Sequence, residues 1–447
     1  MGQRPGQRLR ACARLGSTGL ARSLDVSEPP EQAVPAPERC DLAIVGAGIV
    51  GLAVAREMLA RNPRASVCVL EREQEIAAHQ SSHNSGVIHA GVYYLPGSLK
   101  ARLCVEGSRE IYEYCEQRGI ATKRCGKLIV ARDMSELGRL AELERRGRAN
   151  GVPGLRRLDA TGIQEIEPHA RGIAGLHSPG TGIVDFSAVA RGLADDILAA
   201  GGTVATGCEI TGVASGRRSL RMTHSQGATE AGHAVFCAGA WADRLAVIAG
   251  ADPDPRIVPF RGAYLRLVPD RRELVRALIY PVPDPALPFL GVHLTRNIDG
   301  EVLIGPTALM AGARDAYRLA TVRRNDLLDT LCWPGTWRML ARWWKTGLTE
   351  LRHAAVRGAF VRAAAQYVPA LEVNDVEPSF AGVRAQALGR DGRLLEDFAF
   401  SRTDRALHVR NAPSPAATSS MAIARHIADE AASAFAIATP RGQHEGA

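Results

Sequence analysis

Three glycines and one glutamate form the pattern with the clearest chemical meaning. Gly46, Gly48 and Gly51 follow a short apolar run, and Glu71 ends the next apolar run, 20 residues after Gly51. The first glycine permits a tight turn, the second lets the backbone approach a pyrophosphate, and the third allows close packing of a helix on a strand. Glu71 can accept hydrogen bonds from both ribose hydroxyls. The spacing therefore predicts a dinucleotide site rather than an ordinary turn, with the phosphates at a helix N-terminus.

Residues 81–91 decide between FAD and NAD. They read SSHNSGVIHAG, and such small, hydrogen-bonding residues can run beneath a flavin ring. A nicotinamide enzyme does not need this second contact segment, so we expect FAD. The residues expected to bind FAD are Gly46, Gly48, Ile49, Val50, Gly51, Glu71, Arg72, Ser82, Asn84, Ser85, Gly86, Val87, Ile88, Ile210, Ala238, Gly239, Asn411, Pro413, Ser414, Ala416 and Thr418.

This arrangement resembles the glycine oxidase and D-amino-acid oxidase superfamily of flavoproteins. Several stretches are similar in particular to the L-2-hydroxyglutarate dehydrogenase family, and the resemblance covers about residues 40–430. These stretches are residues 83–89, 125–130, 180–185, 257–262, 288–293, 382–387 and 409–418. Ala263 and Gly389 depart from the pattern, since acidic or similar polar residues are expected there.

The resemblance implies an α/β fold of two lobes. A Rossmann-like FAD-binding domain is assembled from discontinuous segments, and a second, α+β substrate domain carries a mixed sheet over the flavin. It also implies oxidation of L-2-hydroxyglutarate, a small dicarboxylic hydroxy acid, to 2-oxoglutarate. The electrons are expected to pass to a quinone or to an electron-transfer flavoprotein of the respiratory chain.

Such a reaction needs a base for the substrate hydroxyl while the C2 hydride moves to flavin N5. His293 follows the apolar run 289–292 in the part of the chain expected to lie over the flavin, and we favour it. His89, within the flavin-contact segment, is the rival. It can equally orient the flavin or satisfy a buried carbonyl group.

Two carboxylates call for cationic or planar donors, and guanidinium matches carboxylate geometry. Arg384 corresponds to the arginine that binds the α-carboxylate in glycine-oxidase-like enzymes. For the distal carboxylate we consider Arg261, Tyr264 and Tyr94, although tyrosines in apolar strands are commonly core residues. No metal ligand set is expected, because the nine cysteines are scattered without a Cys-x-x-Cys pair.

Strands, helices and glycines place these residues in a coarse order. A strand at 42–45, a helix through residue 59 and a strand at 67–70 form the first unit. A helix at 189–199 and a strand at 234–237 return the chain to that sheet. A final helix over 416–435 is expected to stabilise negative charge at flavin N1 and O2 with its N-terminus.

The expected domain organisation has seven parts. They are a mitochondrial transit peptide and linker (1–37), FAD-binding segments (38–109, 175–245 and 376–437), substrate-domain segments (110–174 and 246–375) and a disordered tail (438–447). The leader contains five arginines and no acidic residue before Asp25, which is typical of a transit peptide. We therefore expect the mitochondrial matrix or the matrix face of the inner membrane, with a disordered tail as the alternative reading of the leader.

The net charge of +8 does not predict nucleic-acid binding, because no lysine-rich tract or zinc-finger spacing accompanies it. Residues 333–345 combine Trp333, Trp337, Trp343 and Trp344 with three basic residues. This segment suits peripheral attachment to the inner membrane, or a helix packed on the second lobe. Two other functions stay open: an amino-acid or N-methyl amino-acid oxidase, and a flavin-binding assembly factor without turnover.

Overall fold

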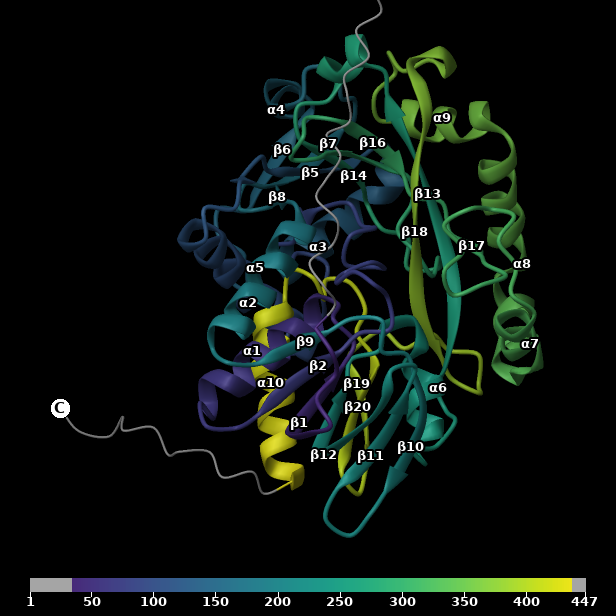
Figure 1. Ribbon diagram of the computed structural model, residues 1–447. Coiled ribbons are helices and arrows are strands. Elements are labelled where there is room, and N and C mark those ends of the chain that lie inside the picture. The colour runs from purple at the N-terminus through teal and green to yellow at the C-terminus, as the bar shows by residue number, and fades with distance from the viewer. Residues whose placement is uncertain (1–33, 436–447) are drawn as a thin grey trace, which may run out of the picture. The chain divides into compact units, whose positions relative to one another are not determined.

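The structure, a computed structural model, describes residues 34–435 (Figure 1). The glycine turn joins β1 (Arg39–Val45) to α1 (Ile49–Arg61), which leads to β2 (Val67–Leu70). β1 and β2 are buried on both faces because helices cover one face and further strands and loops the other. The eight-stranded sheet around them also contains β9 (Thr203–Ala205), β10 (Ile210–Ser215), β11 (Leu220–His224), β12 (Gly227–Phe236), β19 (Ala399–Thr403) and β20 (Ala406–Asn411).

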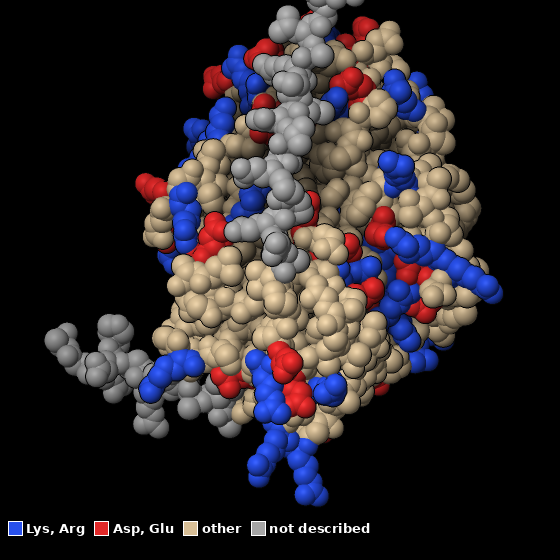
Figure 2. All heavy atoms as spheres, viewed as in Figure 1, with Lys and Arg blue, Asp and Glu red and all other residues tan. Residues whose placement is uncertain are grey.

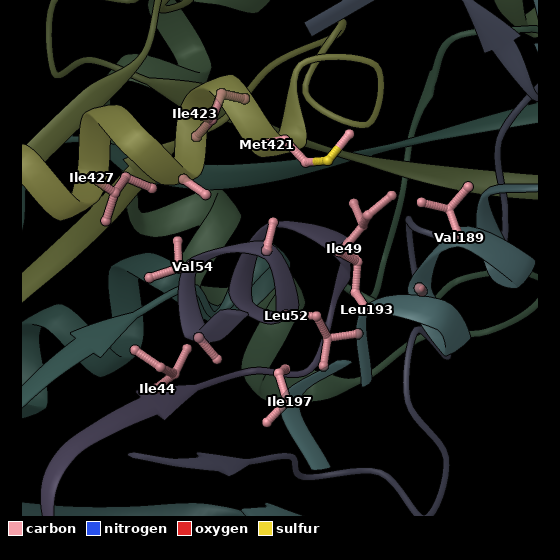
Figure 3. Packing of buried hydrophobic residues seen from close by; sticks show 14 of the residues in the cluster. Ile44, Ile49, Leu52, Val54, Val189, Leu193, Ile197, Met421, Ile423 and Ile427 are labelled. Carbon is pink, nitrogen blue, oxygen red and sulfur yellow. The ribbon is translucent and has the colours of Figure 1, made fainter. Parts of the chain in front are cut away.

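Three distant segments meet in this sheet, since β1 pairs in parallel with both β2 and β12, and β12 pairs in parallel with β20. Helix α1 is apolar nearly all round and packs against α5 (Phe186–Ala199) and α10 (Ser420–Phe435), and α10 in turn packs on α2 (Leu99–Gln117). Figure 3 shows side chains of α1 among those of α5 and α10. The prediction of a Rossmann-like domain built from discontinuous segments is confirmed.

A nine-stranded mixed sheet forms the second lobe. Its long strands β13 (Arg256–Leu267) and β18 (Val376–Leu388) pair antiparallel along most of their lengths. β14 (Leu278–Pro281) and β5 (Lys127–Ala131) supply the parallel pair that makes the sheet mixed, as predicted. The remaining strands are β6 (Arg156–Asp159), β7 (Ala174–Ser178), β15 (His293–Arg296), β16 (Val302–Gly305) and β17 (Leu309–Met310).

Smaller elements complete the described part of the chain. A three-stranded sheet contains β3 (Val87–Ile88), β4 (Thr122–Lys123) and β8 (Gly182–Val184). The other α-helices are α3 (Leu137–Ala149), α4 (Ala160–Ile166), α6 (Ala242–Ile248), α7 (Arg324–Cys332), α8 (Pro334–Ala355) and α9 (Arg357–Ala365). On the face shown in Figure 2, basic and acidic side chains are interspersed rather than gathered by sign.

Three expected domain boundaries fall within continuous elements. Position 110 lies inside α2, which packs on α10, position 175 lies inside β7 of the mixed sheet, and position 246 lies inside α6. The segment from 376 begins with β18, which belongs to the mixed sheet because it pairs with β13 rather than with the FAD-binding sheet. That pairing joins strands more than a hundred residues apart, and no local pattern indicates it.

Most of the expected leader and the tail at 438–447 lie outside the described residues. None of the helices within 34–435 is long and apolar enough to cross a membrane. The final helix begins at Ser420, not at residue 416 as expected, because residues 414–419 form consecutive turns after Pro413. Residues of these turns, rather than the end of α10, therefore line the smaller of the two cavities described below.

Candidate active site

The glycine turn brings three segments closer together than side chains would allow. Gly46 has a φ of +105°, and a Cβ on it would lie 2.6 Å from the carbonyl oxygen of Cys237. A Cβ on Gly51 would lie 2.0 Å from the carbonyl oxygen of Gly46. Only glycine fits these two positions, so the turn keeps the N-terminus of α1 open to a ligand.

Two polar side chains flank this turn. The Glu71 carboxylate, at the end of β2, accepts the N–H groups of Ala47 at 2.7 Å and Glu73 at 2.9 Å, and it also lines the cavity. The Ser81 hydroxyl accepts the N–H of Ile49 at 2.9 Å, which places it at the start of α1. Ser81 lies in the predicted flavin-contact segment but is not among the residues that we expected to bind FAD.

Two cavities, of about 730 and 230 Å³, lie end to end along this turn. The two cavities are neighbours, since five residues line both: Gly48, Gln80, Ser81, Cys237 and Gly239. Sixteen of the predicted FAD-binding residues line one cavity or both: Gly46, Gly48, Ile49, Val50, Glu71, Arg72, Asn84, Ser85, Val87, Ile210, Ala238, Gly239, Asn411, Ser414, Ala416 and Thr418.

The five other predicted residues are Gly51, Ser82, Gly86, Ile88 and Pro413. Gly51 and Gly86 act through close backbone approaches, since a Cβ on Gly86 would lie 2.7 Å from the carbonyl oxygen of Val184. Ser82 is exposed and bonds its own loop, and Ile88 is part of the core. None of these five residues lines either cavity.

The residues around the smaller cavity suit the flavin end of FAD. The Asn411 amide nitrogen donates to the carbonyl oxygens of Leu395 and Asp397, while its buried Oδ1 has no protein partner. The Thr418 hydroxyl accepts the N–H of His89 and donates to the carbonyl of Val87, so it ties the turns at 414–419 to β3. Neighbouring cavities beside a glycine turn, with the Glu71 carboxylate in the wall of one and the unpaired Asn411 Oδ1 in the wall of the other, fit a dinucleotide.

The mixed sheet adds a row of polar side chains on one face. Leu278 of β14 pairs with Lys127 of β5, and directly paired residues point to the same face. Tyr280, two residues after Leu278, shares that face. Its ring stacks on the His293 imidazole of β15 with 4.1 Å between centroids, and the Lys127 ammonium lies 4.3 Å from its centre.

The same row continues across the sheet to Arg384. His293 pairs with Gly305 of β16, and a Cβ on Gly305 would lie 2.8 Å from the Tyr264 ring of β13. Arg384 of β18 pairs with Phe260 of β13. Phe260 and Tyr264 are four residues apart along the strand, so they point to the same face of the sheet. Glycine at position 305 thus leaves open the space between Tyr264 and His293.

His293 is held as a neutral imidazole. Burial, aided by the nearby charges of Arg384 and Lys127, lowers its pKa to about 3 even though a backbone hydrogen bond opposes the shift. Its Nδ1 lies 2.9 Å from the carbonyl oxygen of Gly291, so Nδ1 carries the proton and donates it to that bond. The lone pair of Nε2 is therefore available to accept a proton.

His89 contacts Lys127, a residue that the predicted site did not include. The Lys127 ammonium lies 3.3 Å from His89 Nδ1, and His89 lines the smaller cavity. Burial lowers the pKa of Lys127 to about 7. A lysine inside the apolar run 127–131 was a signal in the sequence, because buried lysines are rare without a partner.

Arg384 and Arg261 lie on opposite faces of the sheet. Arg384 has no ion-pair partner within residues 34–435, and its guanidinium lies 5.3 Å from the Phe289 ring. Arg261 pairs with Val383, which puts it on the other face, and it donates to the carbonyl oxygen of Tyr317. The structure therefore separates Arg261 from the other candidates for the substrate carboxylates.

The two candidate tyrosines lie near residues that line the smaller cavity. Burial raises the pKa of Tyr264, against the charge of Arg384 and the effect of the nearby Ser85 hydroxyl, and Ser85 lines that cavity. Burial raises the pKa of Tyr94 as well, against the effect of the nearby Ser414 hydroxyl. The sheet face and the smaller cavity thus meet at Ser85, and in the described residues no His, Cys, Asp and Glu side chains cluster as a metal site.

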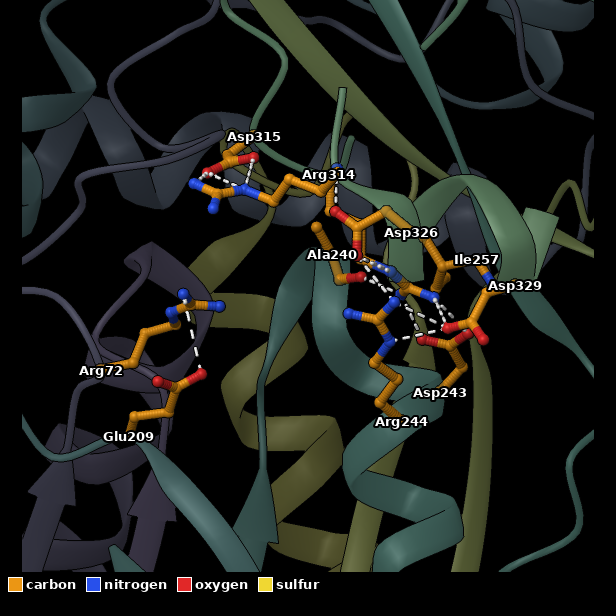
Figure 4. A network of polar contacts seen from close by, with 11 residues as sticks. Arg72, Glu209, Ala240, Asp243, Arg244, Ile257, Arg314, Asp315, Asp326 and Asp329 are labelled. Atoms are coloured by element: carbon orange, nitrogen blue, oxygen red, sulfur yellow. Dashed lines mark hydrogen bonds and ion pairs between the residues drawn. The ribbon is translucent and has the colours of Figure 1, made fainter. Parts of the chain in front are cut away.

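A buried ion-pair network supports the wall of the larger cavity (Figure 4). The Arg314 guanidinium donates to Asp243 at 2.5 and 2.9 Å, and Arg244 contacts Asp326 and Asp329 at 2.7 Å each. Burial alone would raise the pKa of Asp243, but the hydrogen bonds and charge of Arg314 outweigh it and lower that pKa. The network joins α6 to α7 beside the cavity.

Asp243→Asn is expected to reduce the free energy of unfolding by about 3 kcal/mol, because it removes the nearest anionic partner of the buried Arg314 cation and leaves only the longer contacts to Asp326 at 3.9 Å and Asp329 at 3.6 Å. Urea denaturation measures the loss. Asp315→Asn is the matched control, since its Arg323 partner is 61% exposed and such a pair contributes at most about 1 kcal/mol. Equal losses for both variants would contradict the assignment. Because its folded pKa is lowered, Asp243 stabilises the protein above its unfolded pKa and loses this contribution in acid.

Comparison with known proteins gives the class first. Residues 41–430 match the FAD dependent oxidoreductase family, and the chain belongs to that family. It is therefore an FAD-dependent oxidoreductase, and the predicted fold class and cofactor are confirmed.

Within this class the chain is similar to curated L-2-hydroxyglutarate dehydrogenases, which confirms the resemblance. The mitochondrial enzyme of Nematostella vectensis is 46% identical over 90% of this chain and 92% of its own length. The human mitochondrial enzyme is 45% identical over 88% and 89%, and that of Escherichia coli K12 is 42% identical over 87% and 92%.

Solved structures agree on the fold. L-alpha-glycerophosphate oxidase from Mycoplasma pneumoniae with FAD bound has a TM-score of 0.71 at 24% identity, covering 91% of this chain and 97% of that one. Glycine oxidase from Geobacillus kaustophilus has a TM-score of 0.65 at 21% identity, covering 92% and 100%.

Proposed function

We propose that the protein oxidises L-2-hydroxyglutarate to 2-oxoglutarate. The observation that carries this proposal is the sheet face that holds a neutral His293 and an Arg384 without an ion-pair partner in residues 34–435. His293 is near enough to His89, which lines the smaller cavity, to influence its pKa. The names of the curated relatives support the same substrate. A cationic group, a base and a flavin pocket are what removal of a hydride from a 2-hydroxy acid requires.

Each residue of the proposed site has a separate role in the reaction. Bound FAD supplies the hydride acceptor at N5. Arg384 binds the α-carboxylate and so orients the C2–H bond. His293 Nε2 takes the hydroxyl proton as the C2–O bond becomes a carbonyl, and the buried walls of Tyr264 and Tyr280 keep water away. One hydride and one proton leave the substrate, which gives the 2-oxo acid.

Anaerobic reduction of the holoenzyme by each enantiomer of 2-hydroxyglutarate tests the proposal. Bleaching of the flavin absorbance by the L form, with little effect of the D form, is the expected result. Bleaching by glycine or sarcosine instead would favour an amino-acid oxidase. A flavin that no substrate bleaches would favour a binding factor without turnover.

Arg384→Met is expected to lower kcat/KM for L-2-hydroxyglutarate by roughly 10²-fold or more, because the lost charge-assisted bidentate bond is worth about 3 kcal/mol. FAD absorbance per protein should stay at the wild-type value. The exposed Arg393 supplies the control variant Arg393→Met, which should keep wild-type kinetics. Wild-type kcat/KM for Arg384→Met would remove this residue from the site.

We further propose that the exposed face of α8 attaches the enzyme to an anionic membrane, where a quinone or an electron-transfer flavoprotein system takes its electrons. Trp337, Trp344, Leu348 and Leu351 are each more than half exposed. Trp344, Leu348 and Leu351 share one face of the helix after the kink at Trp343, and Trp337 lies before the kink. Four basic residues flank this face: Arg338, Arg342, Lys345 and Arg352. Apolar side chains beside cations suit the boundary between headgroups and acyl chains.

The two other tryptophans of this region are not available to a membrane. Trp333 is buried and donates to the carbonyl oxygen of Leu388, and the half-buried Trp343 donates to Ala286 at a kink in α8. Of the four tryptophans in segment 333–345, Trp337 and Trp344 are the two that a membrane could contact. The segment combines both readings considered from the sequence, a packed helix and an exposed aromatic face.

Trp337→Ala combined with Trp344→Ala is expected to reduce flotation with cardiolipin-containing vesicles several-fold. Each tryptophan that inserts into the membrane buries apolar surface, and the variant loses this contribution. Vesicles of phosphatidylcholine alone should bind wild type weakly. Leu95→Ala with Leu198→Ala removes exposed apolar side chains elsewhere and serves as the control. Unchanged flotation of the tryptophan variant would rule out α8 as the attachment surface.

The mitochondrial matrix is the proposed location. The eukaryotic relatives carry the word mitochondrial in their names, and the arginine-rich leader supports import. The Escherichia coli relatives show that similar enzymes also work in a bacterium.

A further inference from the structure

Lys127 occupies an unusual position for a lysine. Its side chain is 2% exposed, and its ammonium has no carboxylate partner within residues 34–435. It lies 4.3 Å from the centre of the Tyr280 ring and 5.1 Å from that of Tyr93, so aromatic faces stabilise it. Its ammonium nitrogen makes a hydrogen bond with His89 Nδ1 at 3.3 Å. This geometry points the amine at one imidazole nitrogen.

An ammonium group has three donors and no acceptor, so its hydrogen bond fixes the proton on the partner. His89 Nδ1 must accept from Lys127, and the proton of the neutral imidazole is then on Nε2. Burial, followed by the charge of Lys127, lowers the pKa of His89 well below its ordinary value, which keeps the ring neutral. His89 Nε2 has no protein partner in the described chain, and the residue lines the flavin cavity.

The opposite tautomer is present in the second histidine. His293 bonds the Gly291 carbonyl oxygen through Nδ1, which requires a proton on Nδ1 and leaves Nε2 as an acceptor. The two candidate histidines therefore carry complementary groups. One presents an N–H group and the other presents a lone pair.

We propose that Lys127 is a positioning residue that locks His89 as a hydrogen-bond donor toward the cavity, and thereby leaves His293 as the base. This inference rests on the proposed function for the role of the base, but the lock itself depends only on the contact between Lys127 and His89. It assigns different tasks to two histidines that the sequence could not distinguish.

The charged state of Lys127 decides the strength of the lock. Burial lowers the pKa of Lys127 to about 7, while Cys104 and Cys125 oppose this shift. The other titratable groups near it are His89, Tyr93, Tyr280 and His293. Below that pKa the amine can only donate, whereas the neutral amine formed at higher pH can also accept. The tautomer is therefore best measured at about pH 6.

The first test uses the wild-type holoenzyme without substrate. Nitrogen-15 NMR of labelled histidines reports which ring nitrogen carries the proton, and His89→Gln identifies the signal. At about pH 6 we expect His89 to be protonated on Nε2. Protonation on Nδ1 or on both nitrogens would overturn the proposal, whatever substrate the enzyme uses. A correct tautomer without flavin reduction by L-2-hydroxyglutarate would contradict the proposed function alone.

The second test is a double-mutant cycle on flavin reduction in the stopped flow. Lys127→Met should slow reduction roughly tenfold or more, whereas His89→Phe with Lys127→Met should be no slower than His89→Phe alone. His89→Gln keeps an N–H near the position of Nε2 and should retain more activity than His89→Phe. Multiplicative effects of the two substitutions would show that Lys127 acts independently of His89 and would overturn the proposal.

Matched controls separate this role from a loss of folding. Lys123→Met changes an exposed lysine on β4 and should leave the rate unchanged. If Lys127→Met does not retain FAD, Lys127→Gln replaces it in the cycle, because an amide N–H can still donate to His89 Nδ1. In Lys127→Gln the flavin should then be reduced faster than in any variant without a hydrogen-bond donor at position 127. A rate no faster than in those variants would contradict the proposal.

Discussion

His293→Gln is expected to slow reduction of the flavin by L-2-hydroxyglutarate roughly 10²–10⁴-fold, the usual contribution of a positioned base. The glutamine amide keeps a polar group near the position of Nε2, but it has no basic nitrogen lone pair to accept the hydroxyl proton. FAD content should be unchanged because His293 lies on the sheet rather than in the glycine turn. Anaerobic stopped-flow measurement of the absorbance decay gives the rate.

The pH dependence of the wild type provides an independent check. A base works when it is unprotonated, and burial lowers the pKa of His293 to about 3. Activity measured as kcat/KM should therefore persist on acidification below about 6.5, the ordinary pKa of imidazole. His169→Gln, at an exposed position, is the control for the substitution. Wild-type rates in the His293→Gln variant would show that another group is the base.

Gly51→Ala is expected to abolish FAD binding and with it all activity. A Cβ at this position would lie 2.0 Å from the carbonyl oxygen of Gly46 and 3.3 Å from Cys237, so the turn or α1 must shift. Such a shift moves the helix N-terminus away from the pyrophosphate. The ratio of flavin to protein absorbance after purification, and after incubation with added FAD, measures the loss.

The control for this variant is another glycine within a helix. Gly138 in α3 has no atom within 4 Å of its added Cβ. Gly138→Ala should therefore retain FAD, and it should stabilise the helix by up to about 1 kcal/mol because alanine is the better helix former. Full FAD content in Gly51→Ala would contradict the packing described for the glycine turn.

The cofactor half of the site could be predicted because its signals are local. Gly46, Gly48 and Gly51 lie within one turn, and Glu71 ends the strand that follows. Backbone geometry at these positions depends on residues nearby in the chain, so the spacing alone is informative. The Ser81 hydroxyl at the start of α1 escaped prediction, because nothing local links it to residue 49.

The substrate half depends on pairing between distant strands. Arg261 and Arg384 both looked suitable as carboxylate ligands, yet the register of β13 against β18 places them on opposite faces. A register shift of one residue would reverse this, and no sequence pattern reports the register. The contact of Lys127 with His89 likewise joins β5 to the loop after β3.

The order in which segments join the FAD-binding sheet matters for biosynthesis. β20 pairs with the central strand β12, and α10 packs on α1, which carries the glycine turn. A ribosome has therefore released almost the whole chain before the pocket can close around FAD. Premature termination anywhere before the last helix would yield a protein lacking its cofactor, even if every residue that touches the substrate were present.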